Sequence, residues 1–315
     1  MFTTRVKSRR EKPDPKTYLW LDECRQSTPP AVHAINPFAE VFHFRKNIDS
    51  IFVESADGMG DTWHHLIIGS EKAMLIDTGF GIGNLKGLVD ELTGGMPLVV
   101  VNTHEHLDHS FGNCQFDVVH CHEYGVETIQ NRFTPDMWDH LFDENGNGIW
   151  YDCEKKDVIA YKPYHLIAVP NHTRFNLGGD HIIELIHTPG HAAGGASFLD
   201  RHNRILFTGA MHTACVSVGM GVRKPGKYDR EFSTVTAFRN ALVEIAARVD
   251  EFDVLMPAHE IQEVEPSFVT DMLELCNEII AAPDVFAGVL INNKGIALRR
   301  KSHGLASIVY LPEGV

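Results

Sequence analysis

Short apolar runs, separated by turn residues, dominate the chain between residues 41 and 102. Runs rich in Val, Ile and Leu are typical of strands, and the Gly- and Asp-rich stretches between them are typical of turns. A helical period of apolar residues over 82–92, followed by Gly94 and Gly95, predicts one amphipathic helix among the strands. The expected strands are 41–44, 50–54, 64–68, 73–76 and 97–102.

The second half of the chain alternates further strands with helices, which predicts an α/β fold. Residues 132–165 interrupt this alternation with an expected helix at 135–142, a Gly- and Asn-rich loop and a charged segment, so we interpret them as an insertion. The other expected helices are 123–131, 232–249 and 267–281, and the expected strands are 117–120, 166–169, 181–186, 195–199, 204–207, 254–256, 296–299 and 306–311.

The first 35 residues are polar and punctuated by proline. We expect residues 1–40 to form an N-terminal extension that wraps the surface or a partner subunit rather than forming core. A homo-oligomer is therefore one of the possible assemblies. Residues 41–315 are expected to form one domain that includes the insertion.

Charge and cysteine content narrow the class of protein. The formal charge of −14, from 28 basic and 42 acidic residues, disfavours phosphate backbones and anionic membranes as partners. The six cysteines contain no CxxC pair, which in a chain of 315 residues indicates reduced thiols. No apolar run has the length of a membrane span, and the N-terminal segment lacks a signal-peptide pattern. We therefore expect a cytoplasmic protein with a small-molecule substrate, without a nucleic-acid partner and without a membrane.

Four metal-ligand side chains fall within six residues of the segment 103–109 (THEHLDH), directly after an expected strand. His104 and His106 are two residues apart, so an extended backbone points both imidazoles to one side. Asp108 and His109 lie beyond the bend and can face a second position. The segment can therefore supply ligands to two adjacent metal ions.

Two more histidines follow strand-like runs, in the motifs TPGH at 188–191 and MPAH at 256–259. With LIDTG at 75–79 and LFTG at 206–209, these motifs resemble the signatures of the metallo-β-lactamase superfamily, in the expected order and over residues 40–265. The resemblance implies a four-layer αβ/βα sandwich, the metallo-β-lactamase fold, with the helical and loop insertion at 132–165.

The resemblance also implies a dinuclear zinc site. One ion would bind His104, His106 and His191, and the second would bind Asp108, His109 and His259. Such a site makes the protein a zinc-dependent hydrolase, in which a metal-bound hydroxide attacks a small ester, thioester, lactone or amide substrate. In this scheme Asp108 is catalytic as well as a ligand, because it holds the hydroxide in line.

One position departs from the superfamily pattern. Most superfamily hydrolases have an Asp that bridges both metals directly after the Thr-Gly of the late strand, and this chain has Ala210 there. The occupancy of the second metal position is therefore open, and His212 is the nearest substitute ligand. The superfamily uses the position of Asp77 to orient a ligand or the loop, and a turn-capping role is the alternative.

Two other functions use the same ligands and stay open. One is a phosphodiesterase or nuclease, which the acidic charge and the absence of a basic stretch disfavour. The other is a non-catalytic metal-binding module.

A second motif resembles a calcium-binding EF-hand loop. Residues 143–154 place oxygen ligands at loop positions one, three and five, glycine at six and glutamate at twelve. An Asn- and Gly-rich surface turn is the alternative interpretation. The calcium ligands would be Asp143, Asn145, Asn147, Ile149 and Glu154.

The substrate pocket is expected to lie in the loops around the metals. Arg223, together with Lys224 and Lys227, could pair with an anionic leaving group or carboxylate, and a solvated basic face is the alternative. The residues predicted to line this pocket are Met59, Asp61, Trp63, His65, Arg223 and Tyr228.

Overall fold

The computed structural model describes residues 15–55, 61–149, 151–213, 215–224, 226–292 and 295–315. The chain divides into two compact units. The first unit comprises residues 1–121, 126–168 and 176–181, and the second comprises residues 122–125, 169–175 and 182–315. Within the described ranges, no helix combines the length and the apolar character that a membrane span requires.

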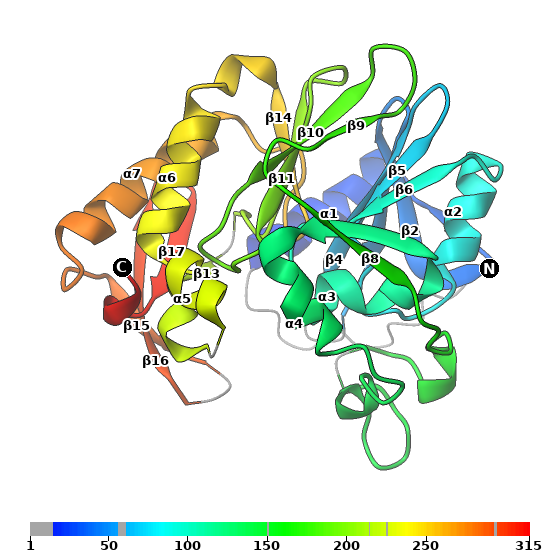
Figure 1. The fold of residues 1–315 in the computed structure, drawn as a ribbon, viewed down its shortest axis with the longest axis horizontal. Coiled ribbons are helices and arrows are strands. Elements are labelled where there is room, and N and C mark those ends of the chain that lie inside the picture. Colours follow the sequence, from blue (N-terminus) through cyan, green and yellow to red (C-terminus); the bar gives the residue numbers. More distant parts are fainter. Residues whose placement is uncertain (1–14, 56–60, 150, 214, 225, 293–294) are drawn as a thin grey trace. The chain divides into compact units, whose positions relative to one another are not determined.

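An eight-stranded mixed sheet forms the centre of the first unit, with its strands in chain order (Figure 1). The pairs from β1 to β5 are antiparallel, whereas the β5–β6 and β6–β7 pairs are parallel. Strand β5 is buried along its whole length, which explains why its sequence is a continuous apolar run instead of an alternating one. The strands are β1 Ala31–His33, β2 Asn36–Arg45, β3 Ile48–Val53, β4 Thr62–Ile68, β5 Ala73–Ile76, β6 Leu98–Val101, β7 Val118–His122 and β8 His165–Val169.

Helix α2 (Leu85–Thr93) confirms the predicted amphipathic helix. Its residues Leu85, Leu88 and Val89 are buried against apolar side chains of the sheet, as their spacing of three and four requires. The side chain of Asn84 caps the first turn by accepting a hydrogen bond from the Gly87 amide at 2.9 Å. Gly94 ends the helix in the left-handed conformation, with φ of 64°.

Helix α1 (Pro15–Ser27) corrects the expectation that the N-terminal extension forms no core. Leu21 is 2% exposed and packs with Phe42, Phe52 and Trp63. Arg25 on the same helix forms ion pairs with Glu40 and Glu54 of the first unit. A single buried leucine in a polar segment produces no periodic signal, so the sequence pattern gave no sign of this packing.

The insertion contains less helix than expected. The predicted helix at 135–142 is wrong, because only the short 3₁₀ turn Asp139–Leu141 forms there. Trp138, Leu141 and Phe142 instead pack with Phe80 and with other apolar side chains of the first unit. Their helix-like spacing therefore reflects burial against neighbouring loops and not a helical stripe.

The second unit contains a five-stranded and a four-stranded sheet (Figure 1). The first has the order β14-β12-β11-β10-β9 and the second the order β13-β17-β16-β15. The five strands are β9 Arg174–Asn176, β10 Ile182–His187, β11 Ala196–Asp200, β12 Ile205–Gly209 and β14 Val254–Pro257. The other four are β13 Val216–Val218, β15 Gly288–Ile291, β16 Ala297–His303 and β17 Ala306–Tyr310.

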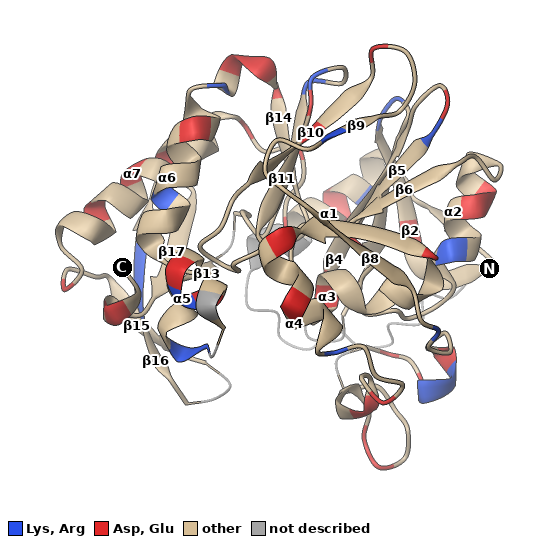
Figure 2. Ribbon diagram, viewed as in Figure 1, with Lys and Arg blue, Asp and Glu red and all other residues tan. Residues whose placement is uncertain are grey.

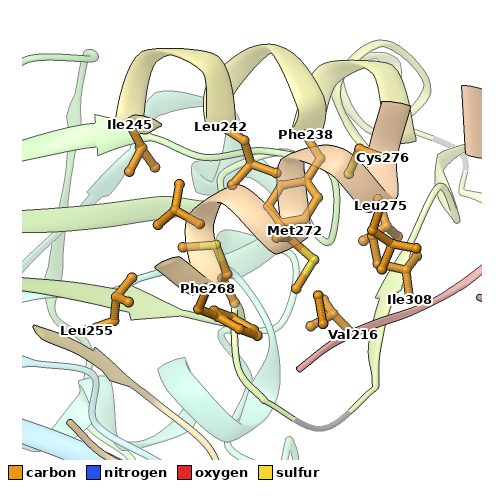
Figure 3. Packing of buried hydrophobic residues seen from close by; sticks show 14 of the residues in the cluster. Val216, Phe238, Leu242, Ile245, Leu255, Phe268, Met272, Leu275, Cys276 and Ile308 are labelled. Atoms are coloured by element: carbon orange, nitrogen blue, oxygen red, sulfur yellow. The ribbon is translucent and has the colours of Figure 1, made fainter. Parts of the chain in front are cut away.

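Helices α6 (Val235–Ala246) and α7 (Ser267–Ala281) pack against each other and build the core of the second unit (Figure 3). Phe238 and Leu242 of α6 and Met272 of α7 meet apolar side chains of the sheets in one cluster. Helix α7 matches its predicted range.

The other predicted helices have different bounds in the structure. The expected helix 232–249 is shorter in the structure and corresponds to α6, because Thr234 caps it by accepting a hydrogen bond from the Ala237 amide at 3.0 Å. The residues before this cap form a separate helix, α5 (Lys227–Phe232), which was not predicted. The expected helix 123–131 becomes a 3₁₀ turn followed by α4 (Val126–Gln130), and helix α3 (Leu107–Ser110) lies in the histidine segment.

An ion-pair network around Glu184 is expected to stabilise the second unit. Arg248 donates to both carboxylate oxygens of Glu184, at 3.1 and 2.9 Å, and Arg201 and His172 add further hydrogen bonds. Burial would raise the pKa of Glu184, but these donors hold it at about 2. We expect Glu184→Gln to lower the free energy of unfolding by about 2 kcal/mol at pH 7 in urea denaturation.

The pH dependence of this effect has a defined sign. A carboxylate whose folded pKa is lowered stabilises fully above its ordinary pKa of 4.5, and the stabilisation is lost as pH falls through about 2. The difference in the free energy of unfolding between the wild type and Glu184→Gln should therefore shrink as the pH falls from 4.5 to about 2. Asp90→Asn, which breaks an exposed pair with Lys86, is the control and should cost about 0.5 kcal/mol or less. An equal cost for both variants would contradict the prediction.

Candidate metal centre

The segment 103–109 is held by backbone and amide contacts within the first unit. Strand β6 ends at Val101, and the Asn102 side-chain amide donates to the carbonyl of His109 at 2.8 Å. The hydroxyl of Thr78 donates to the same carbonyl at 3.1 Å and to the side-chain oxygen of Asn113 at 2.7 Å. These bonds fix both ends of the segment, so its histidines are presented on a rigid loop.

Asp77 is the anchor of this loop. It is fully buried, and its two carboxylate oxygens accept hydrogen bonds from the amide and the hydroxyl of Thr103, both at 2.7 Å. His109 Nδ1 lies 2.7 Å from Asp77 Oδ2 and donates to it. The structure thus places Asp77 where it orients a candidate ligand, and its φ of 66° puts the backbone in the left-handed region that Asp tolerates better than most residues.

The hydrogen bonds to Asp77 and Thr103 leave a particular nitrogen of each imidazole for a metal. The single proton of the Thr103 hydroxyl is donated to Asp77, so the hydroxyl oxygen must accept a hydrogen bond from His104 Nδ1, at 3.1 Å. Because Nδ1 of His104 then carries the proton, its Nε2 is the atom that can bind a metal. His104 Nε2 lies 3.0 Å from His106 Nδ1, so these two nitrogens converge. Because Nδ1 of His109 is bound to Asp77, its Nε2 is the atom that can bind a metal.

Asp108 and His109 form an adjacent pair of candidate ligands. Asp108 Oδ2 lies 3.4 Å from His109 Nε2, and the Asp108 side chain is 23% exposed whereas that of His109 is 1% exposed. Burial would lower the pKa of His109, but the carboxylates of Asp108 and Asp77 raise it to about 10. A metal ion must displace the proton on Nε2, so binding to this pair is expected to weaken as pH falls.

His191 belongs to the second unit and follows strand β10. The left-handed Gly190, with φ of 117°, packs directly on Phe238, where a β-carbon would lie 2.3 Å from the Phe238 Cβ. His191 Nδ1 donates to the carbonyl of Ser217 at 2.8 Å, which leaves Nε2 as the ligand atom. The loop at 188–191 therefore presents one imidazole nitrogen in a defined tautomer.

His259, also in the second unit, follows strand β14. The Ala258 amide donates to the carbonyl of Gly209 at 3.0 Å, which ties this loop to the end of β12. The rings of His212 and His259 lie 5.3 Å apart between centroids. His212 is thus placed beside the candidate ligand His259, whereas Ala210, at the end of β12, offers no donor atom.

The predicted pocket residues of the early hairpin are buried inside the first unit. Met59 lies outside the described residues. Asp61 accepts from the amide of Ser55, His65 lies 3.1 Å from the Ser50 hydroxyl, and Trp63 is 1% exposed among aromatic core side chains.

Asp61, Trp63 and His65 are thus buried in the first unit, and their role as pocket residues stays a prediction. Side chains alternate along a strand, so the neighbours Thr62 and His64 face the other way. Those two line a small cavity of about 10 Å³, with room for about one water molecule, together with Thr78 and Gly79.

The two predicted pocket residues of the second unit lie near its surface. Arg223 is about half exposed and lies 3.5 Å from a carboxylate oxygen of Glu313. Tyr228 on α5 is partly buried and stacks on Tyr124. Both side chains can therefore reach solvent.

The candidate calcium loop satisfies its carboxylates internally. Asp143 accepts hydrogen bonds from the amides of Asn145 and Asn147 at 2.9 and 2.8 Å, as in an Asx turn. Glu154 pairs with Lys156 at 2.7 Å. Asn145 and Ile149 are exposed, and calcium binding by this loop stays a prediction.

Several supporting residues were not identified from the sequence. Asn102, Thr103, Asn113 and Ser217 fix the loops or the tautomers of the candidate ligands. Asn102 and Thr103 lie at the end of a strand beside the ligand motif, which was a usable signal. Ser217 acts through its backbone carbonyl, for which the residue type carries no signal.

Solved structures resemble the chain in fold. A metallo-beta-lactamase family protein from Thermus thermophilus has a TM-score of 0.51 and 16% identity, and covers 77% of this chain and 84% of its own. A beta-lactamase domain protein from Burkholderia ambifaria has a TM-score of 0.54 and 14% identity, and covers 79% and 77%. These similarities confirm the predicted α/β metallo-β-lactamase fold with mixed sheets.

Curated relatives share a smaller part of the sequence but at higher identity. The acyl-coenzyme A thioesterase MBLAC2 of Homo sapiens is 31% identical over 177 residues, which is 51% of this chain and 61% of that protein. The Bos taurus protein of the same name is 30% identical over 178 residues, with the same coverage. The chain thus spans about three fifths of the length of the curated relatives that it matches.

The family model of the metallo-beta-lactamase superfamily matches residues 58–252, which is more than half of the chain. This range contains LIDTG, the histidine segment, TPGH and LFTG, and it ends before MPAH. The chain belongs to the metallo-beta-lactamase superfamily.

Proposed function

We propose that the protein is a zinc-dependent thioesterase. The observation that carries this proposal is the 31% identity over 177 residues to an acyl-coenzyme A thioesterase of the same superfamily. In the proposal, His191 completes one ligand set with His104 and His106, and His259 completes the other with Asp108 and His109. Among the residues that the structure describes, these two sets of three are groups of side chains that could each hold a metal ion.

The donor chemistry fits zinc. Each set contains imidazole nitrogens, one set adds a carboxylate, and three protein ligands leave a position open, as in catalytic zinc sites. Hydrogen bonds to Thr103, Asp77 and Ser217 already select the nitrogen that would bind. Zinc would supply a Lewis acid that polarises the thioester carbonyl and lowers the pKa of water.

The chain's own residues would orient the reactants. Asp108, which is partly exposed, would accept a hydrogen bond from the attacking water and hold it in line with the carbonyl carbon. Asp77 and Asn102 would keep the loop rigid, so that little reorganisation is needed during the reaction. A thiol has a pKa of about 8.5, so the thiolate can leave without a strong general acid.

The second metal position departs from the superfamily pattern at Ala210. Ala210 removes the usual bridging carboxylate, so the set of Asp108, His109 and His259 lacks that ligand. The proximity of His212 to His259 supports His212 as the substitute ligand. Metal analysis of the His212→Ala variant would show a loss of about one equivalent if His212 has this role.

A substrate panel tests the proposed function. Zinc-loaded protein is assayed with acyl-coenzyme A, acyl-pantetheine, an oxygen ester, a lactone, an anilide and a phosphodiester, and its metal content is measured in parallel. The expected result is thioester hydrolysis with kcat/KM of about 10⁴ M⁻¹s⁻¹ or more. Turnover of the phosphodiester in place of the thioesters would move the function to the alternative class, and no turnover of any substrate would favour a non-catalytic metal-binding module.

A further inference from the structure

Five aromatic rings of the second unit form a cluster that neither candidate metal set uses. We call these rings the aromatic cluster, and its members are His122, Tyr124, His187, Tyr228 and Phe232. They come from the end of β7, the turn after it, the end of β10 and helix α5. Only Tyr228 among them was singled out by its sequence position.

Two histidines form the buried base of the aromatic cluster. The rings of His122 and His187 are parallel within 2°, with centroids 3.9 Å apart. Burial lowers the pKa of both, to about 3 for His122, so they are neutral and stack as aromatic rings at physiological pH. His187 Nε2 donates to the carbonyl of Ala193 at 2.8 Å, which anchors this base on the loop that carries His191.

Three larger rings lie on this base and reach solvent. Tyr124 is near-parallel to Tyr228, at 4.4 Å and 20°, and to Phe232, at 4.6 Å and 17°. Tyr124 and Phe232 also contact the ring of His187 edge-on. All three are only partly buried, so the aromatic cluster offers ring surface on which another planar group can stack.

Basic residues lie in the segment that carries Tyr228 and Phe232. The turn Gly221–Arg223 packs against α5, where the Gly221 amide donates to the carbonyl of Ser233 at 3.0 Å. Arg223 and Arg230 are exposed, in and beside α5, and Figure 2 shows basic positions in this part of the chain. Lys224 lies between them in sequence and pairs with Asp229 at 3.2 Å.

This basic segment stands out because the chain as a whole has a formal charge of −14. Residues 221–232 contain four basic and two acidic residues. Guanidinium groups bind phosphates through paired N–H donors, and an aromatic surface binds the face of a base. The combination fits a ligand that carries both phosphates and a planar ring.

We propose that the aromatic cluster, with Arg223 and Arg230, binds the nucleotide half of a coenzyme A thioester. The adenine ring extends the stack formed by Tyr124, Tyr228 and Phe232, and the phosphates pair with the two arginines. This inference rests on the proposed thioesterase function, because it gives a binding site to the part of the thioester substrate that is distant from the reacting carbonyl. Binding energy from that part would favour coenzyme A thioesters over shorter ones.

The direct test is binding of adenosine 3′,5′-diphosphate, which contains the nucleotide but no thioester. Isothermal titration calorimetry is performed on the full chain and on Tyr228→Ala and Arg223→Ala/Arg230→Ala. We expect each variant to bind about tenfold more weakly or worse than the wild type. Phe286→Ala is the matched control. Phe286 is an exposed ring outside the aromatic cluster, and the guanidinium of Arg299 lies over it. This variant should bind adenosine 3′,5′-diphosphate as the wild type does.

A kinetic comparison separates this inference from the proposed function. The ratio of KM values for acyl-pantetheine and acyl-coenzyme A is measured for the wild type and Tyr228→Ala, and the preference for coenzyme A should fall about tenfold in the variant. Hydrolysis of both thioesters with equal KM in the wild type would overturn the inference and leave the proposed function intact. Absence of thioester hydrolysis, with nucleotide binding that still depends on Tyr228, would overturn the proposed function alone. Adenosine 3′,5′-diphosphate binding that is undetectable, or unchanged in both variants, would also overturn the inference.

Discussion

Replacing His106 by alanine is expected to lower kcat/KM for a thioester by about 10³-fold or more. His106 Nδ1 and His104 Nε2 converge at 3.0 Å, so both imidazoles address one metal position in the first unit. Loss of one of three protein ligands removes Lewis-acid stabilisation of several kcal/mol, and each 1.36 kcal/mol corresponds to about tenfold in rate. Steady-state kinetics and zinc content, measured on the same preparation, check the result.

The matched control for this variant is His165→Ala. His165 is exposed on strand β8 of the same unit, and neither candidate metal set includes it. This variant should retain both activity and metal content. The metal-centre assignment would be overturned if His106→Ala kept its zinc and its activity, or if His165→Ala lost them to the same degree.

Helices and strands were predictable where the pattern of apolar residues within the segment itself determines the element. Helix α7 and the strands β4, β5 and β10 follow from apolar runs whose length and pattern match their elements. Helix α1 and the insertion were mispredicted because tertiary packing decides them. Leu21 is buried by three aromatic residues that lie on other elements, and no pattern within its own segment reports this contact.

The candidate ligands were predicted through motifs that resemble those of the superfamily, and each motif follows a strand-like run, where sites of α/β folds lie. The supporting contacts were only partly predictable. Asp77 was identified through its motif, whereas the carbonyl of Ser217 was not, because a backbone acceptor can come from any residue type. The predicted pocket residues Trp63 and His65 lie on β4, which is buried on both faces, so the strand pattern could not tell a pocket from core.

The stacked histidines are a further case that sequence alone does not resolve. His122 and His187 are 65 positions apart, and they are two of 19 histidines in the chain. Their parallel contact is a tertiary arrangement that no spacing within either segment indicates.

Replacing Asp77 by asparagine is expected to weaken metal binding by about 10- to 100-fold and to destabilise the protein by about 3 kcal/mol. Both oxygens of Asp77 accept from donors, so an asparagine amide must place its NH₂ group against an N–H or O–H. Asparagine also tolerates the positive φ of this position, which makes it a better test than alanine because the backbone is not strained as well. Metal affinity is measured by competition with a chelator, and stability by thermal unfolding.

Asp200→Asn separates the positioning role of Asp77 from a general loss of stability. Asp200 is also fully buried, and its carboxylate accepts hydrogen bonds from the amide and side chain of Asn203 within the second unit. Asp200→Asn should lower the melting temperature yet retain the wild-type zinc affinity. If Asp77→Asn lowers the melting temperature to the same extent and also keeps its zinc affinity, Asp77 is a structural residue. A selective loss of affinity in Asp77→Asn shows that its contact with His109 Nδ1 prepares Nε2 for the metal, since the fold is perturbed equally in both variants.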